Sequence, residues 1–166
     1  MKRRPQILAY SATFIALIAA GSWLSIPFFP VPLTLQTLFV LLSGIVMRRH
    51  AVLPVTLYIL LGAMNLPVFH NGTAGLGVLL GPTGGYLIGF IPAALVVGLA
   101  YERRQARYRI PGLIAATVTI LAAGAAWLAY SAALSPFQAV LIGFVPFVVG
   151  DLVKAAAAYT IGKRVA

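Results

Sequence analysis

The fold of this chain is decided by residues 136–162, which read PFQAVLIGFVPFVVGDLVKAAAAYTIG. The stretch is almost entirely apolar or small, and it is long enough for a helix across a membrane, which needs about 20 residues. Only Asp151 and Lys154 are charged, and a spacing of three places them on one face of that helix. Because a charge at membrane depth is costly without compensation, the pair predicts a polar site inside a helical bundle, and in particular a ligand site. A purely structural pair that locks two helices is the alternative.

The composition of the whole chain also indicates a membrane protein. Its 166 residues are 61% hydrophobic and 8% charged, whereas a soluble domain usually carries about 25% charged residues. The mean hydropathy is +1.01. Cysteine is absent, so neither disulfides nor thiolate chemistry are expected. The hydrophobic segments leave no room for a soluble catalytic or nucleotide-binding domain, and we expect one integral membrane domain over residues 1–166.

Six hydrophobic segments are predicted to be membrane-spanning helices, so the expected fold class is all-α and polytopic. Prolines bound or interrupt several of them, as at Pro27, Pro30 and Pro32 after the first segment, because proline breaks a helix. The second and third segments are shorter than a full crossing usually requires. The predicted spans are about 7–26, 33–47, 51–66, 84–101, 111–134 and 136–162.

The basic residues predict the orientation of these spans. With the N-terminus inside, all Lys and Arg residues except Lys154 fall at cytoplasmic ends, as the positive-inside rule requires. Both termini are therefore expected to be cytoplasmic, and the net charge of +10 indicates contact with anionic lipid rather than with nucleic acid. The clusters are Lys2, Arg3 and Arg4; Arg48 and Arg49; Arg103, Arg104, Arg107 and Arg109; and Lys163 and Arg164.

The longest outer loop, residues 65–86, is rich in glycine and still apolar. Backbone at membrane depth must be buried in protein or line a cavity, so we interpret this loop as a lid or partly re-entrant segment over the outer end of the bundle. Thr83 is expected to cap the fourth span. The N–H groups of residues 84–86 would then face the outer cavity and favour anionic or carbonyl oxygens.

Several other residues have both a functional and a structural interpretation. Gln36, at the outer start of the second span, either contacts a ligand or makes an interhelical hydrogen bond, because its amide both donates and accepts. Small residues four apart allow close helix packing, either within the subunit or onto another membrane subunit. Such residues are Ala12, Ala16 and Ala20 in the first span and Gly85 and Gly89 in the fourth.

The sequence contains no pattern typical of catalysis or metal binding. Metal-ligand spacings of His, Cys and acidic residues are absent, and no Gly-Lys-Ser/Thr motif for nucleotide phosphates occurs. We therefore expect no metal site, no ATPase activity and no enzyme.

Five segments are distributed in order over nearly the whole chain: PVPLTLQTL (30–38), LYILLG (57–62), LPVF (66–69), LGPTGGYLIGF (80–90) and PFVVGDLVK (146–154). Together they resemble the BioY family, the biotin-binding S components of energy-coupling-factor (ECF) transporters. The combination of GPTGGY with GDxxK is specific. The chain departs from the family at His70 and Asn71, where members often have small residues, and residues 111–134 are only generically similar.

The resemblance implies a six-helix S-component fold in the plasma membrane of a prokaryote, with biotin held near the outer face for import. It also implies a transmembrane coupling subunit and a pair of cytoplasmic ATPases as partners. Biotin is the substrate, and no cofactor is expected. The matching positions imply biotin contacts at Asp151, Lys154, Gln36, Tyr86, Thr83 and Phe69, and docking of the coupling subunit at Ala12 and Ala16.

Two other functions stay open at this point. One is a stand-alone, ion-coupled carrier for another small vitamin-like molecule. The other is a non-transporting membrane scaffold subunit, in which the Asp151–Lys154 pair is structural.

Overall fold

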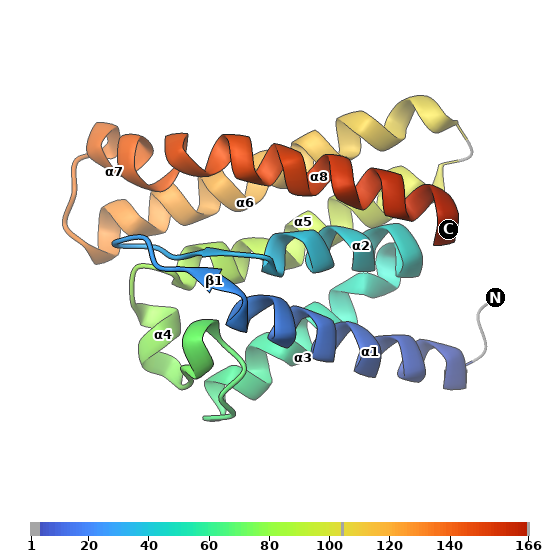
Figure 1. Cartoon of the computed structure of the whole chain (residues 1–166), viewed down its shortest axis with the longest axis horizontal. Helices are drawn as coiled ribbons and strands as arrows, with labels where there is room; N and C mark the ends of the chain where they lie inside the picture. The colour runs from blue at the N-terminus through green and yellow to red at the C-terminus, as the bar shows by residue number, and fades with distance from the viewer. Residues whose placement is uncertain (1–3, 104, 166) are drawn as a thin grey trace.

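The computed structural model describes residues 4–103 and 105–165. Three residues of the predicted basic clusters, Lys2, Arg3 and Arg104, lie outside the described residues. The described chain is an elongated bundle of helices that run roughly along one axis (Figure 1). The expected all-α class is therefore confirmed.

Six long helices follow the order of the predicted spans; their ends differ by a few residues, except that the last helix begins nine residues later than predicted. They are α1 (Arg4–Trp23), α2 (Gln36–Met47), α3 (Val52–Ala63), α5 (Gly84–Glu102), α6 (Arg109–Ser131) and α8 (Val145–Val165). Shorter elements connect them: β1 (Ser25–Ile26), β2 (Leu33–Thr34), η1 (Arg48–Ala51), η2 (His70–Gly72), α4 (Leu76–Leu80), η3 (Ala106–Tyr108) and α7 (Pro136–Gly143).

The predicted sixth span is interrupted, and this differs from the single helix expected over residues 136–162. The helix breaks at Phe144, where φ is −118°, and continues as α8. Pro146 explains the break, because proline has no N–H to donate to the carbonyl of Ile142, four residues before it, and its ring clashes with that carbonyl in a continuous helix. Ser135 starts α7 with a capping box, in which its hydroxyl accepts from the Gln138 N–H and the Gln138 side chain accepts from the Ser135 N–H.

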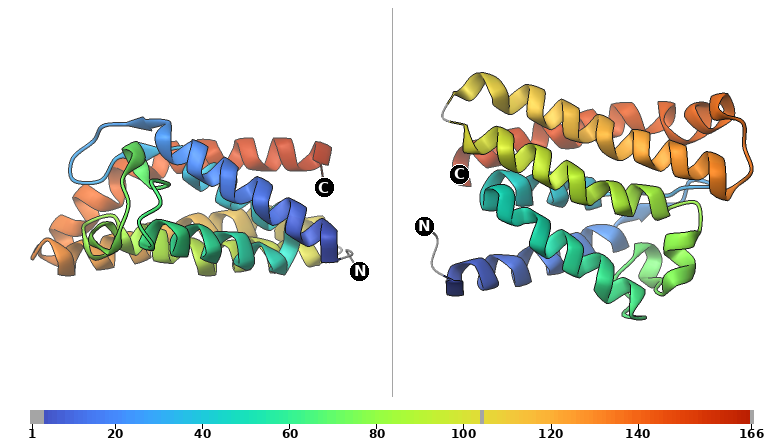
Figure 2. Two further views of the ribbon diagram at one scale, coloured as in Figure 1. Left: turned by 90° about the horizontal axis from the view of Figure 1, so that it is seen from below. Right: turned by 180° about the vertical axis from the view of Figure 1, so that it is seen from behind.

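The second and third helices form one reversing unit. Five stretches of the described chain are long and apolar enough to cross a membrane, and one of these is Gln36–Ala63. It contains a turn at Arg48, where φ is 60°, and the chain reverses there, so that α2 and α3 run in opposite chain directions and both extend from the turn toward the other end of the bundle (Figures 1 and 2). Each has 12 residues, or about 18 Å of helix. The antiparallel β1–β2 hairpin, pairing Ser25 with Thr34, extends this unit toward the outer end (Figure 1).

Apart from Lys154, the basic residues of the described chain gather at one end of the bundle. The start of α1, the η1 turn, the α5–α6 connection and the end of α8 all lie there (Figure 1). Arg49 Nε lies 2.7 Å from Glu102 Oε1 and joins η1 to α5 at this end. The positive-inside rule makes this end cytoplasmic, in agreement with the predicted orientation. The opposite end is called the outer end below.

Helix α5 is the centre of the core, packed against α2, α3 and α6. Figure 2 shows α5 and α6 side by side and antiparallel. Their close contact depends on Gly85, where a Cβ atom would lie 2.2 Å from Cβ of Trp127, and on Gly89, where it would lie 3.0 Å from Cβ of Ala123. The small residues of this fourth predicted span therefore pack within the subunit.

The small residues of α1 behave differently. Ala12, Ala16 and Ala20 are all exposed, so this stripe faces away from the described bundle.

Candidate functional site

A cavity lies in the outer part of the bundle, among α2, α5, α6 and α8. The walls are mainly apolar, with a few polar groups that converge on the interior. The lining residues are Val31, Pro32, Thr34, Gln36, Thr37, His70, Thr83, Tyr86, Leu87, Phe90, Ile120, Phe147, Asp151 and Lys154.

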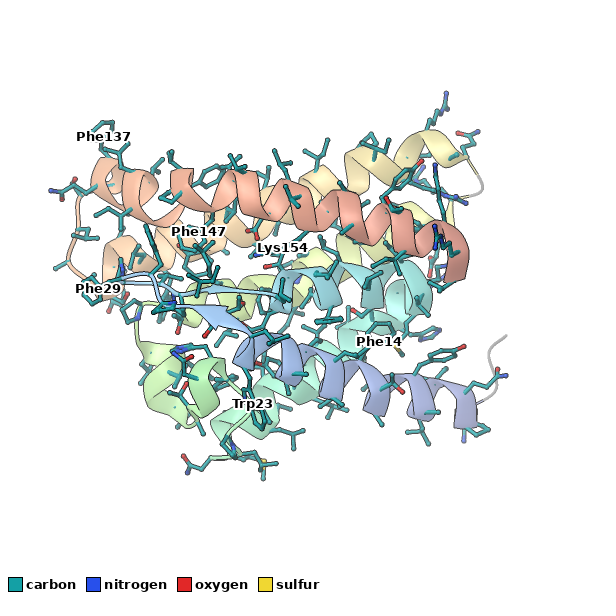
Figure 3. The ribbon with its side chains drawn as sticks, viewed as in Figure 1. Phe14, Trp23, Phe29, Phe137, Phe147 and Lys154 are labelled. Atoms are coloured by element: carbon teal, nitrogen blue, oxygen red, sulfur yellow. The ribbon has the colours of Figure 1, made fainter. Side chains whose placement is uncertain are left out.

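Asp151 and Lys154 form a buried ion pair in this cavity. Lys154 Nζ donates to Asp151 Oδ1 at 2.7 Å, and the two side chains are 13% and 4% exposed respectively. Figure 3 shows Lys154 and Phe147 on the side of α8 that faces α2 and the hairpin. Within residues 4–103 and 105–165 neither charged group has another hydrogen-bond partner. The ammonium therefore keeps two N–H groups, and the carboxylate keeps acceptor capacity, for a ligand.

Gln36 makes an interhelical hydrogen bond, and it also lines the cavity. Its Nε2 donates to the Tyr58 hydroxyl on α3, and its Oε1 accepts from Thr34 Oγ1 at 3.1 Å. The Tyr58 hydroxyl in turn donates to the Val68 carbonyl at 2.9 Å. These bonds hold the Gln36 amide in one orientation at the start of α2.

The side chain of Tyr86 is fixed by a hydrogen bond to the helix break that precedes α8. Its hydroxyl donates to the carbonyl of Gly143, the last residue of α7. Its ring needs Gly124 on α6, because a Cβ atom there would lie 2.1 Å from Cε1 of Tyr86. Phe147 packs with its ring centroid 6.0 Å from that of Tyr86. The interruption of the predicted sixth span thus supplies the carbonyl that accepts from the Tyr86 hydroxyl and an aromatic ring, that of Phe147, in the wall of the cavity.

Thr83 lines the cavity, but the prediction that its side chain caps α5 is wrong. The residue holds the N-cap position with helical φ and ψ and makes no side-chain cap; its Oγ1 donates to the Val78 carbonyl at 3.3 Å instead. The N–H groups of Gly84 and Tyr86 donate to the carbonyls of Gly81 and Thr83. The tight turn before α5 brings these carbonyls within reach, so the two N–H groups are not available to a ligand.

Phe69 is the one predicted contact residue that does not line the cavity. It is fully buried, and its ring packs edge-on against Tyr58 with centroids 5.6 Å apart. The ring occupies the space left by Gly62, where a Cβ atom would lie 2.1 Å from Cζ of Phe69. Phe69 therefore anchors the predicted lid on α3, behind the Tyr58–Gln36 hydrogen bond.

His70 lines the cavity instead, although the sequence alone marked it only as a departure from the family. Its Nδ1 is buried and has no hydrogen-bond partner within the described residues. Burial lowers the pKa of His70 below its ordinary value, so the imidazole is neutral at pH 7. The sequence signal that could have identified His70 as a lining residue was its position directly after the LPVF segment. Thr34, Thr37 and Phe147 were also missed as lining residues, because each lies inside a matching segment that has no distinctive chemistry.

Across residues 4–103 and 105–165, no group of three or more His, Cys, Asp or Glu side chains is arranged to hold a metal ion. The polar groups of the cavity are suited instead to hydrogen bonding with a small neutral or anionic molecule.

Known proteins resemble this chain over nearly its full length. The model of the BioY family matches residues 1–166. A biotin transporter BioY of Thermotoga maritima is 44% identical over 95% of this chain and 94% of its own length. A probable biotin transporter BioY of Pyrococcus horikoshii is 40% identical over 92% and 91%.

The fold also has a close match among solved structures. The 2.1 Å crystal structure of the S component for biotin from an ECF-type ABC transporter superposes with a TM-score of 0.87 and 25% identity. The match covers 99% of this chain and 94% of that one. The expected S-component fold is thereby confirmed, and the chain belongs to the BioY family.

Proposed function

We propose that this protein is the biotin-binding membrane subunit of a biotin uptake system. The observation that carries the proposal is the Asp151–Lys154 pair, which is buried in a mostly apolar cavity in the outer half of the bundle. Membership of the BioY family supports biotin as the substrate. The multi-pass helical fold and the basic cytoplasmic end place the protein in the plasma membrane.

The chemistry of biotin matches this cavity. Biotin has a polar ureido ring, an apolar thioether ring and chain, and a carboxylate. The carboxylate of Asp151 can accept from the ureido N–H groups, and the ammonium of Lys154 can donate to a carbonyl or carboxylate oxygen. Aromatic and aliphatic side chains such as Phe147 and Leu87 supply the apolar surface that buries most of a small ligand.

The other motif residues have supporting roles in this proposal. Gln36, Thr83 and Tyr86 contact the ligand and orient it, and each lines the cavity. Phe69 acts as a positioning residue, because it packs against Tyr58, which accepts the hydrogen bond from Gln36.

We further propose that the exposed stripe of α1 docks a transmembrane coupling subunit, which works with cytoplasmic ATPases. Ala12 and Ala16 are exposed and small, and small residues allow close approach of a partner helix. Substituting both by Leu is expected to abolish ATP-driven uptake and to leave biotin binding unchanged.

Equilibrium binding of labelled biotin to the purified, detergent-solubilised protein tests the proposed function. We expect saturable binding near one site per chain that excess unlabelled biotin displaces. A well-folded protein that binds no biotin would overturn the proposal. Uptake that collapses with an ionophore and needs no ATPase would favour the ion-coupled carrier.

A further inference from the structure

The cytoplasmic end of the bundle contains two buried hydrogen-bond donors without acceptors. Arg109 begins α6, and its guanidinium lies over the Tyr101 ring, 5.4 Å from the centroid. Arg109 Nε and the Tyr101 hydroxyl are both buried and have no partner within the described residues, and Tyr101 is only 5% exposed. Because buried polar groups are normally hydrogen-bonded, the two donors indicate a missing acceptor that comes from outside the described chain.

The charges around these donors indicate that the acceptor is an anion. Arg48 also lies over the Tyr101 ring, 5.9 Å from its centroid. The first turn of α6 has no acidic residue and no side-chain cap. The positive end of the helix dipole therefore adds to the positive electrostatic potential around the two arginines. Glu102, the acid closest in sequence, is already paired with Arg49.

An apolar groove begins one residue beyond Arg109. It has a volume of about 240 Å³ and lies between α6 and α8, which run side by side in Figure 1. At its cytoplasmic end, Lys163 Nζ lies 4.5 Å from the centroid of the Tyr159 ring. Its walls include Ile110, Leu113 and Ile114 of α6 and Leu152, Ala155 and Tyr159 of α8.

We propose that this groove and the adjacent donors bind one anionic phospholipid of the cytoplasmic leaflet. The phosphate accepts from Arg109 and the Tyr101 hydroxyl, and one acyl chain lies along the groove. From Tyr159 to Leu152 the groove extends about 10 Å into the membrane along α8, which suits an acyl chain and not a soluble anion. The cytoplasmic leaflet is also the one that carries anionic lipid.

Native mass spectrometry of the detergent-solubilised protein tests the proposal, with dioleoylphosphatidylglycerol and dioleoylphosphatidylcholine as probes. We expect one phosphatidylglycerol molecule to be retained in preference to phosphatidylcholine. Arg109→Gln should weaken its retention by about tenfold or more, because it removes a hydrogen bond between two charged groups. The matched control is Arg107→Gln, because Arg107 is exposed and stacks on Tyr108; it should change retention less than about twofold.

Two more variants distinguish specific lipid binding at this site from nonspecific electrostatic attraction of anionic lipid and from misfolding of the variant. Tyr101→Phe keeps the ring and removes only the hydroxyl, so it should weaken phosphatidylglycerol retention without changing the thermal midpoint in lipid-free detergent. Ala156→Phe fills the groove and should weaken the dioleoyl lipid but not inorganic phosphate or the dihexanoyl lipid. Equal losses in the two arginine variants, or no preference for phosphatidylglycerol in the unaltered protein, would overturn the proposal.

Discussion

Asp151–Lys154 and Arg49–Glu102 are ion pairs of the same length, 2.7 Å, in different parts of the bundle. The first is almost completely buried in the outer half, whereas Arg49 and Glu102 are 65% and 25% exposed at the cytoplasmic end. An exposed pair contributes about 0–1 kcal/mol, but breaking a buried pair costs about 3–5 kcal/mol. The Arg49–Glu102 pair therefore contributes little to stability, whereas the loss of either partner of the Asp151–Lys154 pair is costly.

The largest effect is expected from neutralising one partner of the buried pair. Asp151→Asn leaves Lys154 without its anion, and removing one partner of a buried, hydrogen-bonded charge pair costs about 2–5 kcal/mol. Biotin affinity should fall by about 30-fold or more, since 1.4 kcal/mol corresponds to a factor of ten. The measurement is equilibrium binding of labelled biotin.

Glu102→Gln is the matched control for that experiment. Because Glu102 is partly exposed and remote from the cavity, this variant should bind biotin within about twofold of the unaltered protein. Equal losses in the two variants would remove the distinction between the pairs.

A second prediction concerns Gly124, whose lack of a side chain leaves room for the Tyr86 ring. Gly124→Ala places a methyl group 2.1 Å from the Tyr86 ring, and such overpacking costs about 1–3 kcal/mol. The thermal midpoint in detergent should fall, and biotin binding should weaken with it. Gly77→Ala is the control, because a Cβ atom there meets nothing within 4 Å. An unaltered midpoint in Gly124→Ala would contradict the packing described for α5 and α6.

The third prediction tests whether the Tyr58 hydroxyl orients Gln36. Tyr58→Phe removes the acceptor for Gln36 Nε2, whereas the Val68 carbonyl keeps its second donor, Ser22 Oγ. An unsatisfied buried group costs about 1–3 kcal/mol. Biotin affinity should fall by up to about tenfold, less than in Asp151→Asn. Tyr130→Phe, at an 81% exposed position, should have no effect in the same binding assay. A full retention of affinity in Tyr58→Phe would show that Gln36 needs no such support.

The smallest effect is expected from lowering the pH, which should reduce the stability of the protein through His70. Burial lowers the pKa of His70 from its ordinary value of 6.5, so the unfolded chain binds a proton more readily than the folded one. Stability contributed by neutral His70 is therefore complete above pH 6.5 and is lost as the pH falls through the folded-state pKa. Thermal midpoints measured from pH 8 to pH 5 should fall less in His70→Gln than in the unaltered protein. Parallel curves would contradict the burial of this imidazole.

The sequence predicted the buried pair and the order of the helices because both depend on rare or periodic signals. A charged residue inside a long apolar stretch stands out by composition alone, and the basic clusters alternate with the spans. Asp151, Lys154, Gln36, Thr83 and Tyr86 do line one cavity. These features require no knowledge of how distant segments pack.

The features that the sequence alone did not place depend on contacts between distant segments. Phe69 matches a motif, but only the fold shows that Gly62 offers its ring a space away from the cavity. The Gln36–Tyr58 bond joins residues 22 positions apart. Pro146 was visible in the sequence, yet only the fold shows that the interruption before α8 places the Gly143 carbonyl against the Tyr86 hydroxyl of α5.

The contact of biotin with the buried pair is tested most directly by chemical modification of Lys154. An amine-reactive acylating reagent, followed by peptide mass spectrometry, reports the labelling of Lys154, and the exposed Lys163 serves as an internal control in the same sample. We predict that saturating biotin strongly protects Lys154 and leaves the labelling of Lys163 unchanged. Equal labelling of Lys154 with and without biotin, in protein that demonstrably binds biotin, would contradict the assignment of this pair to the binding site.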